Sequence, residues 1–80
     1  MKFRVKQSHI KNGKRNTLSL CPIALCIREQ FPKADSVNVT NAKIRIDDLQ
    51  INTPENVKNF IANFDTGQPV KSIKFTIKGL

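Results

Sequence analysis

The sequence predicts an α+β domain in which two helices cover one face of a mainly antiparallel sheet of four or five strands. Short stretches near both ends and in the middle of the chain alternate apolar and polar residues, as half-buried strands do. Two longer stretches repeat apolar residues at helical spacing. Because each strand has a single apolar face, both helices are expected on the same side, in a two-layer sandwich of order β-α-β-β-β-α-β.

The chain begins with a predicted strand over residues 2–6, where Phe3 and Val5 alternate with basic residues. Residues 8–13 allow two interpretations. Ser8 is suited to cap a single helical turn that Gly13 ends, and the Asn12-Gly13 pair is also a hairpin turn sequence. The flanking residues do not alternate cleanly, which favours the turn of helix.

The first long helix is predicted over residues 18–31. Ser19 is the expected cap, Pro22 is tolerated only in a first turn, and Pro32 ends the helix. Its apolar face consists of Leu20, Ile23, Ala24, Ile27 and Phe31.

Three short strands are predicted after this helix, joined as an antiparallel meander. Natural tight turns separate them at Asn41-Ala42 and at Asp47-Asp48. The apolar positions of the strands are Val37 and Val39, then Ile44 and Ile46, then Leu49 and Ile51.

The second long helix has the clearest boundaries in the sequence. Thr53 is the expected cap, Pro54 occupies the first position, and Gly67 stops the helix. Its apolar face consists of Val57, Phe60, Ile61 and Phe64. A last strand is predicted over residues 70–77, with Ile73, Phe75 and Ile77 inward.

Length and composition predict one domain over residues 1–80, with a small core. No stretch approaches the ~20 apolar residues that span a bilayer, and the start of the chain lacks the apolar region of a secretory signal. Two cysteines are too few for a disulfide scaffold. We therefore expect a cytoplasmic protein without a membrane partner.

The net charge is strongly positive and unevenly distributed. Fourteen Lys and Arg oppose six Asp and Glu, which gives +8, and residues 1–16 hold six basic and no acidic side chains. The basic residues at outward strand positions are Lys2, Arg4, Lys6, Lys43, Arg45, Lys74 and Lys78. If the first and last strands are neighbours, their outward residues merge into one basic surface. Such charges also keep an exposed sheet soluble and block association of its edges.

A basic sheet face of this kind suits a polyanion. The partner is either nucleic acid, bound through its phosphate backbone, or an acidic protein on which this chain acts as an inhibitor or adaptor. All five phenylalanines fall on predicted core faces, which disfavours base stacking, and neither long helix is basic enough to read a major groove. The candidate nucleic-acid-binding residues are Lys2, Arg4, Lys6, Lys11, Lys14, Arg15, Lys74 and Lys78.

Catalysis, metal binding and cofactor binding find little support in the sequence. His9 is the single histidine, so a structural zinc site lacks ligands, and no Gly-rich phosphate loop is present. No nucleophile, base and orienting group can be proposed together, so we do not expect an enzyme. Cys21 lies near a helix N-terminus, where a thiolate is favoured, so a reactive cysteine stands as an alternative to a small buried hydrophobe.

Two segments carry a resemblance to a known group of proteins. The run Leu20-Cys21-Pro22-Ile23-Ala24-Leu25 and the segment 57–67, which ends in Phe64-Asp65-Thr66-Gly67, resemble a pattern in small accessory proteins of phages, prophages and other bacterial mobile elements. The resemblance implies a bacterial or phage accessory protein that acts by binding, for example against host defence. It carries no functional residue across to this chain.

Overall fold

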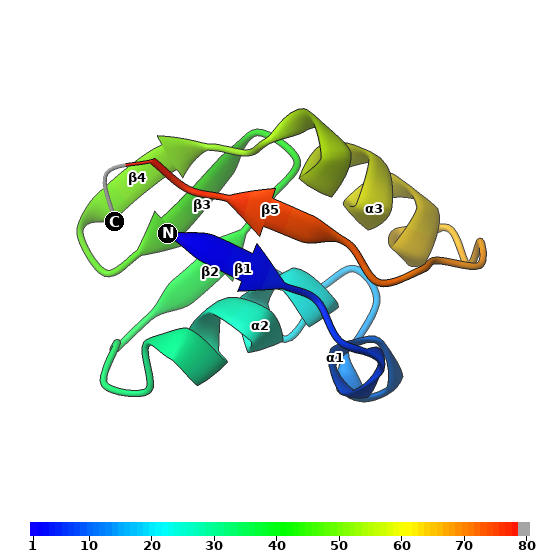
Figure 1. The fold of residues 1–80 in the computed structure, drawn as a ribbon, viewed down its shortest axis with the longest axis horizontal. Coiled ribbons are helices and arrows are strands. Elements are labelled where there is room, and N and C mark those ends of the chain that lie inside the picture. The colour runs from blue at the N-terminus through cyan, green and yellow to red at the C-terminus, as the bar shows by residue number, and fades with distance from the viewer. Residues whose placement is uncertain (79–80) are drawn as a thin grey trace.

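The computed structural model describes residues 1–78, which form five strands and three helices (Figure 1). The chain forms β1 (Lys2–Arg4), α1 (Gln7–Asn12), α2 (Pro22–Gln30), β2 (Val37–Val39), β3 (Lys43–Ile46), β4 (Leu49–Asn52), α3 (Glu55–Asp65) and β5 (Lys74–Thr76). The predicted element order and the α+β class are confirmed, and the segment after β1 is the turn of helix rather than a hairpin.

The strands form two antiparallel sheets, so the prediction of one sheet covered by two helices is wrong. β1 pairs with β5 in a two-stranded ribbon, and β2, β3 and β4 form a meander. Strand alternation predicts most of the buried strand residues, although Leu49 of β4 is exposed. It does not predict which strands pair, because pairing between β1 and β5 joins the two ends of the chain.

One hydrophobic core joins the two sheets. Phe3 and Phe75 from the ribbon belong to the same buried cluster as Val37 and Ile44 from the meander. The helix α2 contacts both β1 and β2 and so bridges the sheets. In Figure 1 the ribbon lies between α2 and α3. Each sheet therefore turns its apolar face to the core and keeps its own polar face outward.

Both long helices begin later than predicted because other groups use the expected caps. Cys21, not Ser19, caps α2: its Sγ accepts the Ala24 N–H at 3.4 Å, and Pro22 takes the first helical position. The Thr53 hydroxyl donates to the Thr40 carbonyl instead of capping α3, which starts at Glu55.

The end of α3 follows the prediction. Gly67 has φ +83°, a left-handed conformation that ends helices and that glycine adopts without strain. The loop before α2 docks here, because the Asn16 N–H donates to Asp65 and the Arg15 guanidinium lies over Gly67.

Candidate anion-binding surface

The ribbon of β1 and β5 gathers basic side chains on its outer face. The register pairs Lys2 with Thr76, Phe3 with Phe75, and Arg4 with Lys74. The phenylalanines point inward and stack with ring centroids 5.0 Å apart, so the other two pairs point outward, where all four side chains are exposed. The first and last strands are therefore neighbours, and Lys2, Arg4 and Lys74 share one outer face. We call Lys2, Arg4, Lys74 and Thr76 the ribbon face.

Arg4 and Lys74 form a close pair of like charges. Backbone bonds from Val5 to Ile73 and from Ile77 to Met1 fix the alternation of the ladder. Arg4 and Lys74 therefore sit at a non-hydrogen-bonded position, where Cα atoms are only about 4.5 Å apart. Like charges directly opposite each other in such a pair destabilise it.

The same pair is fixed from both sides by the flanking helices. At a non-hydrogen-bonded position the carbonyl groups point away from the partner strand. The Arg4 carbonyl accepts the Cys26 thiol of α2 at 3.2 Å, and the Lys74 carbonyl accepts the Asn56 amide of α3 at 2.7 Å. The two backbone positions are thus held opposite one another by contacts that leave the side-chain charges unpaired.

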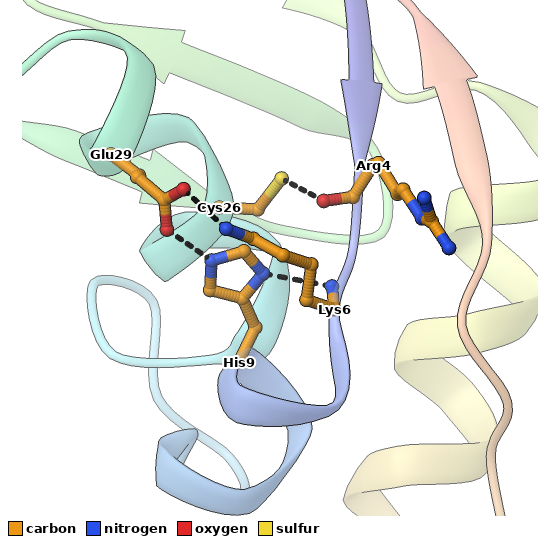
Figure 2. A network of polar contacts seen from close by, with 5 residues as sticks. All are labelled: Arg4, Lys6, His9, Cys26 and Glu29. Carbon is orange, nitrogen blue, oxygen red and sulfur yellow. Dashed lines mark hydrogen bonds and ion pairs between the residues drawn. The ribbon is translucent and has the colours of Figure 1, made fainter.

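Lys6 is drawn into a separate polar network and so does not share the ribbon face. Its Nζ donates to Glu29 Oε1 at 2.7 Å (Figure 2). In the same view the Arg4 side chain extends toward β5, away from this network. Within residues 1–78 the other ion pair joins Lys58 to Glu55, and Glu29 also contacts His9, so no carboxylate is paired with Lys2, Arg4 or Lys74.

His9 is a buried structural residue. Its Nδ1 accepts the Lys6 backbone N–H at 2.9 Å, so Nε2 carries the ring proton and donates to Glu29 Oε2 at 2.7 Å. Hydrogen bonds from Lys6 and then from His9 lower the pKa of the Glu29 carboxyl. Both ring nitrogens are occupied, so His9 holds α1 against α2.

A shallow hollow of about 440 Å³ opens on the ribbon face. Its lining includes the Arg4 and Lys74 pair, Lys2 and Thr76, with Gln30 from the end of α2 at its side. Phe3 and Phe75 also contribute. The hollow therefore combines three basic side chains and two neutral hydrogen-bonding groups, with the apolar core directly behind the ribbon.

The remaining sequence-predicted residues lie outside this hollow. Lys11 is on α1, Lys14 and Arg15 follow it in the loop that docks on α3, and all three are exposed. Lys78 follows β5 and lines a different hollow with Ile51 and Asn52.

The basic residues of β3 lie on the other sheet, and acidic neighbours offset the charge of Arg45. Arg45 shares a hollow with Asp35, Asp47 and Asp48, and Lys43 bonds to Asn52. The meander therefore carries no unbalanced cluster of positive charge comparable with the ribbon face.

Sequence reasoning missed the role of two polar side chains, Thr76 and Gln30. Thr76 occupies an outward position on the last strand, so its place on the basic face follows from the alternation once the β1–β5 pairing is known. No local pattern points to Gln30, because α2 meets the ribbon only through the tertiary fold.

Both thiols are buried and free. Burial raises the pKa of the Cys21 thiol despite the Ala24 N–H that it accepts, and burial raises the pKa of Cys26 to about 11. A thiolate at Cys21 is therefore disfavoured, and desolvation outweighs the effect of the helix N-terminus that the sequence suggested.

No protein-family model, curated protein or solved structure matches this chain. Among residues 1–78 no three or more histidine, cysteine or acidic side chains gather where they could hold a metal ion. None of the described helices is both long enough and apolar enough to cross a membrane.

Proposed function

We propose that this protein associates with nucleic acid by holding phosphate groups on the ribbon face. The observation that carries the proposal is the Arg4–Lys74 pair, two cations opposite each other beside Lys2, without a paired carboxylate in the described residues. Repulsion in this pair opposes folding. A phosphate between the two side chains converts that repulsion into attraction.

The side chains of the ribbon face suit phosphate chemistry. The Arg4 guanidinium presents a planar fork that binds two phosphate oxygens together, and Lys2 and Lys74 act as point charges. Contacts of this kind displace counterions and do not distinguish one base sequence from another. We therefore expect binding that depends steeply on salt and weakly on sequence.

The position of the aromatic residues supports backbone contacts over base contacts. Phe3, Phe60 and Phe75 are buried, and Phe31 and Phe64 pack against the core. Sites that hold single-stranded bases stack them on exposed aromatic rings. Without such rings, attraction to phosphate must supply the affinity.

Fluorescence anisotropy with a labelled oligonucleotide tests this function. Affinity is measured over a salt series for the parent chain, for Arg4→Gln and for Lys74→Met, with Lys33→Met as the matched control because Lys33 is also exposed but lies after α2. Each ribbon variant is expected to weaken binding. The dependence of affinity on salt concentration should also fall by the amount expected for the loss of about one phosphate contact. The control is expected to change neither quantity beyond the effect of net charge.

Two results would contradict the proposal. One is the absence of binding to DNA and RNA at low salt; the other is equal weakening by Lys33→Met and Lys74→Met. A pull-down from nuclease-treated bacterial lysate adds a further test, since an acidic protein retained through Arg4 and Lys74 would favour the inhibitor or adaptor role instead. Either role fits the accessory protein that the sequence resemblance implies.

A further inference from the structure

We propose that the hollow on the ribbon face receives a phosphomonoester, the doubly charged group at the end of a phosphorylated nucleic acid, in preference to the phosphodiesters of its interior. The inference rests on the proposed function and deepens it. It follows from three properties of the hollow: its charge, its hydrogen-bond donors and the apolar core behind it.

The charge of the hollow exceeds what one phosphodiester can balance. Lys2, Arg4 and Lys74 line it, and no carboxylate does. A phosphodiester carries a single negative charge, whereas a phosphomonoester carries about −1.5 to −2 at neutral pH because its second pKa is about 6. The monoester therefore compensates more of the positive charge that meets at the Arg4–Lys74 pair.

The donors of the hollow outnumber the oxygens that an interior phosphodiester offers. Arg4 presents a fork of N–H groups, the two lysines present ammonium groups, and Gln30 and Thr76 add an amide and a hydroxyl. A phosphomonoester has three terminal oxygens and a phosphodiester two. The third oxygen gives the neutral groups at the side of the hollow a partner as well.

The apolar core behind the hollow strengthens these contacts. Phe3 and Phe75 contribute to its lining, and their stacked, almost fully buried rings lie on the core side of the ribbon, behind the basic side chains. A low-dielectric surface below a group of charges increases their effect on a bound anion.

Four other hollows among residues 1–78 lack this combination. Asp65 lines the hollow beside Cys21, and three aspartates surround Arg45 in the hollow of the meander. A carboxylate in the lining repels a phosphate dianion. The hollow next to Lys78 contains that single basic residue.

The test compares two oligonucleotides of identical sequence with a label at the 3′ end, one with a 5′ phosphate and one with a 5′ hydroxyl, in a buffer free of phosphate. The 5′-phosphorylated strand is expected to bind about fivefold to tenfold tighter, the range for one added charge-assisted contact at an exposed site. Inorganic phosphate is expected to compete selectively with the 5′-phosphorylated strand, and to shift the Gln30 side-chain amide signals in NMR spectra.

Variants locate the preference. Lys74→Met is expected to abolish the advantage of the 5′ phosphate and Thr76→Val to reduce it about threefold, whereas Lys71→Met, in the exposed segment before β5, is expected to keep it. Equal affinity for the two strands, or an advantage that survives Lys74→Met, would overturn the inference while the proposed function stands. If inorganic phosphate alone bound as tightly as the 5′-phosphorylated strand, the hollow would still be a phosphate site, but the proposed association with nucleic acid would be wrong.

Discussion

Replacing Lys74 by glutamate is expected to stabilise the fold while it removes the binding of nucleic acid. Lys74 lies opposite Arg4 at a non-hydrogen-bonded position of the ribbon, without a paired carboxylate in residues 1–78. The Lys74→Glu change turns a like-charge pair into an opposite-charge pair. Stability and function should therefore move in opposite directions, which a purely structural role of Lys74 does not predict.

The size of the effect follows from the geometry of the pair. With Cα atoms about 4.5 Å apart, the two long side chains place their charges roughly 7 Å from each other, where two unit charges in water interact by about 0.6 kcal/mol. Reversing one charge turns this repulsion into an attraction, so the interaction energy changes by twice that amount. Salt at 0.1 M reduces the change by about half. The expected gain is about 0.5–1 kcal/mol, within the range of cross-strand pairs, or about 2–8 °C in Tm for a domain of this size.

Thermal unfolding followed by circular dichroism measures this gain. Lys71→Glu is the matched control, because it changes the net charge equally at an exposed position outside the ribbon. The gain is expected to shrink in high salt and to vanish in an Arg4→Gln background. A lower Tm for Lys74→Glu, or an equal rise for Lys71→Glu, would refute the reasoning.

Three further predictions concern the interior of the fold and its polar network. The hydrogen bonds that lower the Glu29 pKa should make its carboxylate stabilising above the unfolded pKa of 4.5. In urea titrations the stability advantage over Glu29→Gln should therefore decline from that pH and disappear as pH falls through the lower pKa of the folded state. Burial and a pKa of about 11 at Cys26 should keep both thiols unreactive toward a thiol reagent at neutral pH until urea unfolds the chain; fast labelling of the native protein would contradict this. Gly13→Ala should lose about 1–3 kcal/mol, because its Cβ would lie 2.6 Å from the Pro22 ring, and Pro22→Ala in the same chain should restore part of that loss.

Local patterns predict most of the secondary structure of this chain. The alternation in residues 2–6 and the helical spacing from Val57 to Phe64 are set by neighbouring residues, and the structure has β1 and α3 there. Gly67 ends α3 as expected because its conformation is a local property. The predicted caps at Ser19 and Thr53 are wrong: α2 begins at Pro22 with Cys21 as its cap, and the Thr53 hydroxyl donates to the Thr40 carbonyl.

The arrangement of the strands and the composition of the candidate site depend on contacts between distant segments. A single apolar face per strand is equally consistent with one sheet and with two sheets around a common core. The charge pattern identifies Lys2, Arg4 and Lys74, but only the fold shows that Lys6 is bound to Glu29 and that Gln30 completes the hollow.

The most direct test of the central claim is an NMR titration of the labelled chain with a short DNA duplex at low salt. If phosphate groups bind the outer face of the β1–β5 ribbon, the backbone amide signals of Lys2 to Arg4 and of Lys74 to Thr76 should shift most. Signals of β3, which carries Lys43 and Arg45, should change little. Shifts centred on β3, or on the loop that carries Lys14 and Arg15, would contradict the account.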